Sequence, residues 1–300
     1  MLVLAALLWG MGFAWAKNVG AAVNVAANLP ESAVLGPTLT LALRFGLAGV
    51  LWMMLFPSSR RGWTPATWGR GLVLGAVLAL GVILQHLGLA RSSEATIAFL
   101  TNLTVVFVPI IVAIVVRQLP KIQLLCAIPF ALVGIWLLTG AKASGLSVGE
   151  WFGVGCAVAF SFELVLLNWL IPKDSPMRLT GLMFAVTAIA SFAFALASPG
   201  FLQIDWWQLC TPGIVGQFVL LTLLTTLLAF GLMNVYQPQV DTTRAAIVYL
   251  FEPIFAATFA WMVQGASMTP LALVGAGLIL IANGVAEIRL KSNLAVDERR

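Results

Sequence analysis

The sequence contains few charged residues. Asp, Glu, Lys and Arg make up 9% of its 300 residues, whereas a soluble domain normally carries about 25%. Hydrophobic residues make up 61%, too many for a globule that must cover itself with polar groups to stay in water. Lipid must therefore replace water around much of the surface. The composition excludes a soluble globular protein and leaves little chain for a separate soluble domain.

Cysteine and histidine are also scarce, and the motifs of common catalytic sites are missing. Cys126, Cys156 and Cys210 lie far apart in or beside apolar runs, so we expect no disulfide, no metal site and three buried, inert thiols. The sequence has no Walker A loop, HExxH motif or GxSxG motif, and no cluster of Cys and His. We therefore expect no cofactor, no ATP hydrolysis of the usual kind and no enzymatic activity.

Long apolar runs separated by short polar turns make up most of the chain. The turns at 57–61, 172–176 and 198–200 combine Pro, Gly and Ser with charged residues. The pattern predicts an all-α integral membrane protein with ten transmembrane helices. The first run begins at Met1 without a basic region or a cleavage site, so it is predicted to be a retained span. The predicted spans are 2–20, 33–56, 70–90, 95–117, 120–139, 148–169, 178–197, 212–236, 243–264 and 270–288.

Lys and Arg are distributed unevenly between the two sides of these spans. If the N-terminus is inside, twelve lie in inside loops or the tail, three lie at outside ends, and Arg44 lies within the second span. Short basic loops stay on the cytoplasmic side, so both termini are predicted to be cytoplasmic. Because the positive charges follow this rule, the formal charge of +5 indicates no nucleic-acid partner. The inside residues are Arg60, Arg61, Arg70, Arg117, Lys121, Lys173, Arg178, Arg244, Arg289, Lys291, Arg299 and Arg300, and the outside residues are Lys17, Arg91 and Lys142.

The two halves of the chain share landmarks at a spacing of 150 residues. Five spans in each half is an odd number, so the halves must insert in opposite orientations. The sequence therefore predicts an inverted repeat with a pathway between the halves near the bilayer midplane. Residues 1–140 form the first predicted five-helix unit, and residues 141–300 form the second with a short cytoplasmic tail. The alternative is a duplication that only produced a stable bundle. The landmark pairs are Pro120 and Pro270, Gly134 and Gly284, Gly81 and Gly231, Ala95 and Ala245, Ile97 and Ile247, and Leu100 and Leu250.

Several short stretches resemble the drug/metabolite transporter superfamily, specifically its EamA-type members. They are Leu8-Trp9-Gly10-Met11-Gly12-Phe13, Ala42-Leu43-Arg44-Phe45, Phe251-Glu252-Pro253 and the glycines Gly275 and Gly284. Within this family the chain is most similar to the YddG-type aromatic amino-acid exporters. The resemblance covers essentially the whole chain and implies export of amino acids across a bacterial-type inner membrane. Asn102-Leu103 departs from the pattern, because the second half has Glu252-Pro253 at the matching place.

Ionisable residues within the predicted spans are costly in lipid and indicate functional sites by default. Arg44 lies near the middle of the second span and is a partner for a substrate carboxylate, a gate or a structural clamp. Glu252 in the ninth span could bind a cation or a substrate ammonium group, titrate a proton, or satisfy a broken helix. Glu163 in the sixth span could pair with Arg44 or with a substrate amine.

Prolines and rings complete the candidate site. Pro109 and Pro253 interrupt predicted spans four and nine, and opened backbone in such spans lines transport pathways. His86, Phe99, Tyr236 and Tyr249 fall on spans three, four, eight and nine, which the family resemblance places around a central cavity; ordinary packing is the alternative. The predicted substrate-binding residues are His86, Phe99, Asn102, Glu163, Tyr236, Tyr249 and Glu252, and the predicted gating or structural residues are Arg44, Pro109 and Pro253.

The leading interpretation is a secondary transporter that moves a small organic solute by alternating access, either downhill or coupled to an ion or proton gradient. A drug or other metabolite exporter is the alternative within the superfamily. An intramembrane enzyme would need a nucleophile or metal set that the sequence does not display, and a channel would need a ring of repeated polar groups. The expected partners are the small-molecule substrate and the lipid bilayer, and we expect a monomer.

Overall fold

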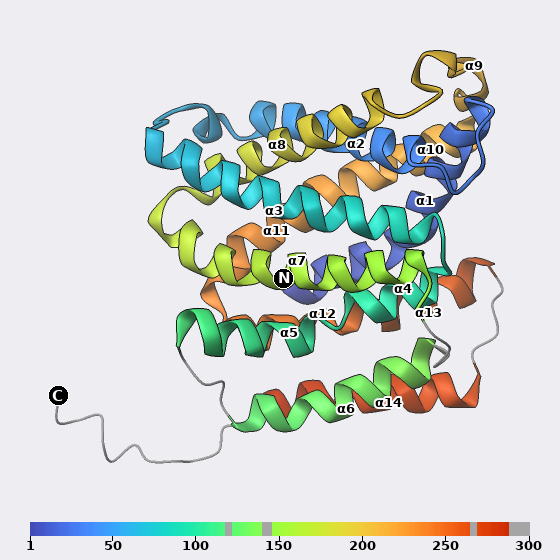
Figure 1. Cartoon of the computed structure of the whole chain (residues 1–300). Helices are drawn as coiled ribbons and strands as arrows, with labels where there is room; N and C mark the ends of the chain where they lie inside the picture. Colours follow the sequence, from blue (N-terminus) through green and yellow to red (C-terminus); the bar gives the residue numbers. More distant parts are fainter. Residues whose placement is uncertain (118–121, 140–145, 265–268, 288–300) are drawn as a thin grey trace.

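The computed structural model describes residues 1–117, 122–139, 146–264 and 269–287, and the regular structure of these residues is entirely helical. Pro120, Lys121, Lys142, the predicted unit boundary at 140 and 141 and the tail from 288 lie outside them. Most of the long helices run side by side (Figure 1). The α-helices are α1 (Leu2–Ala26), α2 (Leu35–Leu55), α3 (Pro65–Leu89), α4 (Glu94–Thr101), α5 (Thr104–Ile111), α6 (Ile122–Thr139), α7 (Val148–Leu170), α8 (Pro176–Leu196), α9 (Trp206–Leu209), α10 (Pro212–Leu220), α11 (Ala229–Tyr236), α12 (Thr242–Tyr249), α13 (Phe251–Gln264) and α14 (Pro270–Glu287).

The length and composition of these helices support a multi-pass membrane protein. Within the described residues, seven helical stretches are long and apolar enough to cross a membrane. Ile122–Leu138 and Pro270–Val285 are shorter apolar helices. The count of ten spans, the inversion of the halves and the side on which the termini lie therefore remain predictions. The seven stretches are Leu2–Ala26, Leu35–Leu55, Pro65–Leu89, Thr96–Val115, Val148–Lys173, Pro176–Leu196 and Pro212–Gln239.

Local sequence explains where α3 begins. The predicted third span started at residue 70, but the helix starts at Pro65. The side-chain oxygen of Thr64 accepts a hydrogen bond from the Thr67 amide at 3.1 Å. Proline fits the first position of a helix because its missing amide hydrogen would have no partner there. Thr64 and Pro65 together form an ordinary helix start, five residues ahead of the apolar run.

The predicted fourth and ninth spans are each divided into two helices. The first division lies at Asn102 and Leu103, between α4 and α5, and the second lies at Leu250, between α12 and α13. The predicted interruption at Pro109 is therefore corrected: Pro109 lies inside α5, and the division comes earlier in the chain. Pro253 lies in the first turn of α13, where a proline is tolerated.

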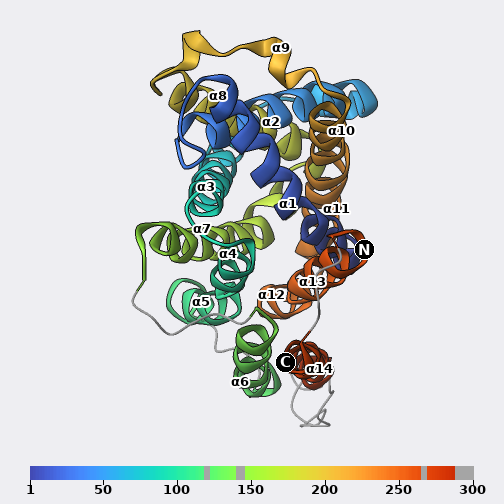
Figure 2. The same cartoon turned by 90° about the vertical axis from the view of Figure 1, so that its right-hand side faces the viewer.

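The helices surround a central region. The view along the helix axes shows α2 and α8 on one side, α6 and α14 on the opposite side, and α1, α3, α7 and α11 between them (Figure 2). α2 packs against α8, α6 packs against α14, and α3 packs against both α7 and α8. Helices from the two halves of the chain are therefore interleaved.

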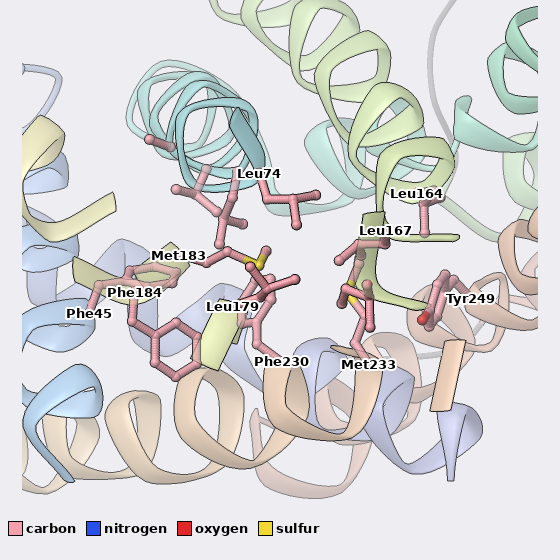
Figure 3. Close-up of a cluster of buried hydrophobic side chains, with 14 of the residues drawn as sticks. Phe45, Leu74, Leu164, Leu167, Leu179, Met183, Phe184, Phe230, Met233 and Tyr249 are labelled. Atoms are coloured by element: carbon pink, nitrogen blue, oxygen red, sulfur yellow. The ribbon is translucent and has the colours of Figure 1, made fainter. Parts of the chain in front are cut away.

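The main apolar core contains side chains from both halves. Phe45 and Leu74 come from the first half, and Leu167, Phe184 and Phe230 come from the second. In Figure 3, Phe45 and Phe184 lie at one end of this cluster and Tyr249 lies at the other. In a bilayer such packing stabilises the bundle mainly by van der Waals contact, because lipid tails are as apolar as the side chains.

Small residues allow α3 to approach α8 closely. A side chain added at Gly75 would place its Cβ 2.6 Å from the Cβ of Val186, and one at Gly71 would collide with Leu182. Both glycines are therefore packing residues at the contact between α3 and α8.

The prediction of three buried thiols is confirmed for one cysteine. Cys156 in α7 is buried, but Cys126 in α6 and Cys210 beside α10 are exposed, and all three are free. The apolar runs around Cys126 did not predict its exposure, because α6 lies beside α14 at the edge of the bundle, where part of its surface faces the surroundings.

A cluster around Asp174 ties α3 to the turn between α7 and α8. The Asp174 carboxylate accepts hydrogen bonds from Thr67 at 2.7 Å, Arg70 at 3.1 Å and Arg178 at 2.9 Å. Burial alone would raise the pKa of this carboxyl, but the hydrogen bonds from Thr67, the Ser175 amide and Arg178, with the charge of Arg178, lower it from 3.8 to about 2. A lowered pKa stabilises the folded protein above the ordinary pKa, and this contribution is lost only as the pH falls toward 2. The cluster therefore stays ionised at physiological pH.

The glycine contact predicts a stability difference between two valine substitutions on one helix. Gly75→Val should lower the thermal midpoint in detergent, because overpacking of this kind costs about 1–3 kcal/mol. Gly69→Val is the matched control, since a Cβ at Gly69 meets nothing within 4 Å. Equal midpoints for the two variants would show that α3 and α8 do not pack as described.

The charge distribution predicts which loops face each side. A cysteine at Asp205 should react with an impermeant maleimide from outside the cell, and a cysteine at Ser58 should react only from inside. Both positions are exposed, whereas Asp174, on the same predicted side as Ser58, is too well covered for efficient labelling. Labelling of the two positions from the opposite sides would overturn the predicted topology.

Candidate functional site

A central cavity is lined by residues from both halves of the chain. Its volume is about 90 Å³, room for a few water molecules. Long helices and both divided segments contribute to it, and the junctions α4–α5 and α12–α13 supply Asn102 and Glu252. The cavity brings together six of the ten predicted site residues: Arg44, His86, Asn102, Glu163, Tyr249 and Glu252.

The ionisable groups of the cavity are divided between the halves. Arg44 and His86 come from the first half, and Glu163 and Glu252 come from the second. All four side chains are buried. Across the described ranges, no ion pair within 4.0 Å involves Arg44, Glu163 or Glu252. The first half of the chain therefore supplies the basic groups of the lining, and the second half supplies its carboxylates.

Several buried polar atoms of the cavity have no hydrogen-bond partner within the described part of the chain. They are Nε of Arg44, Nε2 of His86, Oε1 of Glu163 and the hydroxyl of Tyr249. A buried polar atom without a partner costs roughly 1–3 kcal/mol, and more when it is charged. Polar groups that enter the cavity can remove this cost, so the arrangement suits a polar ligand.

Two of the polar side chains are oriented by their own helices. His86 Nδ1 lies 3.0 Å from the carbonyl oxygen of Val82, and Asn102 Nδ2 donates to the carbonyl of Ala98 at 2.8 Å. These contacts fix one arm of each side chain. Nε2 of His86 and the amide oxygen of Asn102 are left for other contacts.

Aromatic rings form one wall of the cavity. The ring of Trp9 lies 5.1 Å from that of Phe230 and 5.4 Å from that of Tyr249, measured between centroids. Phe45, which belongs to the main core and does not line the cavity, packs against Phe230 at 5.6 Å, and the guanidinium of Arg44 lies 5.1 Å from the Phe45 ring centre. This wall offers flat apolar faces next to the charged groups, and such faces suit a planar apolar side chain.

A π-helical turn positions Trp9. The turn η5 (Leu221–Leu228) joins α10 to α11, and such turns shift the backbone hydrogen-bond ladder by one residue. The indole nitrogen of Trp9 donates to the carbonyl of Thr225 in this turn at 3.0 Å. Gly12 faces the same threonine, whose methyl group lies 2.9 Å from where a glycine substitution would place a Cβ. The close approach of α1 and η5 thus holds the indole at the cavity.

A smaller pocket extends the cavity toward the end of α3 and the loop after α1. It has a volume of about 30 Å³ and shares Ala16, His86 and Leu89 with the cavity. Lys17 and Glu31 also line it. We call this pocket the outer vestibule, because its end of the bundle is the predicted outer side.

The other predicted site residues lie away from the cavity. Phe99 packs between apolar clusters around Ile97 and Val105, and Tyr236 is more than a third exposed at the end of α11. Pro109 and Pro253 are buried within α5 and α13, but neither lines the cavity. The structure therefore does not bring these four residues to the cavity.

Some lining residues were not predicted. Trp9, Gln85, Thr101, Phe160 and Phe230 line the cavity beside the charged groups. Trp9 belongs to the Trp-Gly stretch that suggested the family resemblance, so a signal for it existed. Phe160 and Phe230 had none, because 18 phenylalanines lie in similar apolar runs.

Comparisons with known proteins point to transporters. Residues 147–285 match the model of the EamA-like transporter family. Two proteins of Archaeoglobus fulgidus, each named "Uncharacterized transporter", are 25% and 26% identical to the chain. The alignments cover 96% and 93% of this chain, and 85% and 92% of those proteins.

One solved structure, named only "Crystal structure of protein", shares the fold. It superposes with a TM-score of 0.68 at 17% sequence identity, covering 94% of this chain and 96% of that chain. Together with the apolar helices, these comparisons support a multi-pass membrane transporter. More particularly, the match of residues 147–285 and the two relatives support the drug/metabolite transporter superfamily.

Proposed function

We propose that the protein is a secondary transporter that exports small organic metabolites, above all amino acids with aromatic or other apolar side chains. The observation that carries the proposal is that basic groups, carboxylates and aromatic rings line one cavity without ion pairs between them in the described residues. Arg44 and His86 are the basic groups, Glu163 and Glu252 the carboxylates, and the rings of Trp9, Phe230 and Tyr249 lie in the same lining. An amino acid has the matching features: a carboxylate, an ammonium group and a side chain.

The proposed binding mode follows from these partners. The substrate carboxylate lies toward Arg44, because a guanidinium binds carboxylates through two parallel N–H donors. The ammonium group lies toward Glu163, Glu252 and the free hydroxyl of Tyr249. The substrate side chain lies against Trp9 and the rings next to it.

Alternating access is the proposed mechanism, with residues 1–140 and 141–300 as the two units and both termini inside. Helix packing supports this mechanism, because contacts made by helices of one half have counterparts in the other half. α2 packs against α8 and α6 against α14, each with its repeat counterpart. The packing of α3 against α7 has its counterpart in that of α11 against α1. The divisions near Asn102 and Leu250 also lie close to equivalent positions.

The small cavity volume is consistent with such a cycle. A cavity of about 90 Å³ is smaller than the ~300–1,000 Å³ typical of ligand pockets. An aromatic amino acid fits only after the walls separate, and a rocking motion of the halves provides that separation.

Counterflow in proteoliposomes tests the proposed substrate. Vesicles loaded with phenylalanine or tryptophan should take up the labelled amino acid faster than protein-free vesicles.

Tyr249→Phe should weaken the apparent affinity for the amino acid about two- to tenfold, since a hydrogen bond contributes about 0.5–1.5 kcal/mol. Tyr236→Phe, the chain's other tyrosine, should leave it unchanged because Tyr236 does not line the cavity. Exchange no faster than in empty vesicles would refute the amino-acid substrate; uptake of other solutes would favour a different metabolite or drug.

A second prediction concerns Glu252. Glu252→Gln keeps the shape of the side chain but removes its charge and its ability to exchange a proton. We expect transport to fall about tenfold or more, because a charge-assisted hydrogen bond contributes about 1.5–3 kcal/mol, and the pH dependence of the residual transport to flatten. Glu150→Gln is the control, since Glu150 lies in the first turn of α7 and lines neither the cavity nor the vestibule. An unchanged rate and pH profile in Glu252→Gln would assign the carboxylate a structural role.

A further inference from the structure

The outer vestibule has a counterpart in the second half that is filled with side chains. The vestibule is lined largely by small or polar residues of α1 and by Ala90. Adding 150 to each position replaces them with large aliphatic residues. The pairs are Ala16 and Leu166, Lys17 and Leu167, Gly20 and Leu170, Ala21 and Ile171, and Ala90 and Val240. The same helix-to-helix junction is therefore open in one half and packed in the other.

Side chains close this junction tightly. Leu167 and Ile171 are at most 2% exposed and belong to the main apolar core. Leu166, Leu170 and Val240 pack against that core. The junction joins the end of α7 to the turn η6 (Gln237–Gln239) that follows α11. We call it the inner seam, because it lies at the predicted cytoplasmic end.

Hydrogen bonds between two amide side chains cross the inner seam. Gln237 Nε2 donates to Asn168 Oδ1 at 2.8 Å and to the carbonyl oxygen of Leu164 at 2.9 Å. Asn168 Nδ2 donates to the carbonyl oxygen of Val240 at 2.7 Å. Gln237 is fully buried, and Leu164 lines the central cavity. These bonds therefore close the seam from the wall of the cavity to the predicted cytoplasmic end of α7.

The outer vestibule cannot form the same bonds. The positions equivalent to Asn168 and Gln237 are Asn18 and Leu87. Leu87 has no polar side-chain atom, and Asn18 is exposed. The hydrogen bonds between two amide side chains are thus present at the inner seam and have no equivalent at the outer vestibule.

We propose that Asn168 and Gln237 form a latch on the inner gate, and that the inner seam between α7 and η6 is the exit from the cavity to the inside. The proposal rests on alternating access as the proposed mechanism. In the state described here the vestibule leads outward and the seam is closed. Release of the latch lets α7 and η6 separate as the vestibule closes. The outward-open and inward-open conformations are in equilibrium, so a change that favours one lowers the population of the other.

Cysteine accessibility tests the latch without any substrate. The three native cysteines are replaced by alanine, and a single cysteine is placed at Leu167 in the seam or at Ala21 in the vestibule. Sealed vesicles are treated from each side with a charged, impermeant maleimide. Gln237→Ala should raise the labelling rate at position 167 from the inside about tenfold, equal to about 1.4 kcal/mol. It should also lower the rate at position 21 from the outside.

Gln239→Ala is the matched control, because Gln239 lies on the same turn, is exposed, and donates to the carbonyl oxygen of Val235 in the neighbouring α11 and not across the seam within the described residues. Asn168→Ala removes the latch from the opposite side of the seam and should reproduce the effect, so the test survives if one variant fails to fold. Reciprocal changes at positions 167 and 21 support the gate. Unchanged labelling, or faster labelling at 167 without slower labelling at 21, reduces the seam to static packing and overturns the proposal.

The labelling experiment tests the gate, and the counterflow experiment tests the substrate, so either claim can be refuted without the other. Reciprocal labelling with no amino-acid exchange would leave the gate standing and refute only the substrate. Amino-acid exchange with labelling that ignores the latch would refute only the gate.

Discussion

Burying an ionised side chain in an apolar bundle costs several kcal/mol unless the group meets polar protein atoms or water, and the central cavity is where Arg44, Glu163 and Glu252 find such surroundings. The charges do not neutralise one another in pairs within the described residues. A protein selected only for stability would gain from replacing such groups with apolar ones. Their presence in one cavity, beside polar atoms without partners in the described part of the chain, is the feature on which the proposed ligand-binding role rests. The helices around them position these groups and exclude lipid from them.

The two ends of the proposed pathway differ although they occupy equivalent positions in the predicted repeat. On the predicted outer side, alanine, glycine and lysine leave a vestibule beside His86. On the predicted inner side, leucine and isoleucine fill the matching junction, and Asn168 bonds to Gln237 across it. The Asp174 cluster adds further polar contacts at the same end. In the predicted repeat, a change from small to large residues at a few equivalent positions is enough to favour one conformation of the proposed cycle over the other.

Sequence alone predicted the helical class and the positions of most apolar helices, because lipid demands long apolar runs. It also predicted six residues of the cavity, since an ionisable or polar group at membrane depth is conspicuous. It could not predict that Phe160 and Phe230 line the cavity while Phe99 does not. All three lie in apolar runs, and only the rotation of each helix decides which face meets the cavity. The division at Asn102 was missed for a related reason: Pro109 was the obvious interruption, but a proline can be absorbed within a helix when neighbouring turns adjust.

The fourth and ninth predicted spans are divided at equivalent positions of the predicted repeat but carry different chemistry there. Both junctions bring polar side chains to the cavity, Asn102 in one half and Glu252 in the other. Phe13 and Glu163 form a second equivalent pair in the lining. In each pair only the second half supplies a carboxylate. If the halves were identical, a molecule with one positive and one negative group could bind in two opposite orientations related by the symmetry. For the proposed amino-acid substrate the divergence removes this degeneracy, because in both pairs the carboxylate comes from the second half. Under the proposed alternating access, a repeat that loses its chemical symmetry in this way can hold the substrate in a single orientation throughout the cycle.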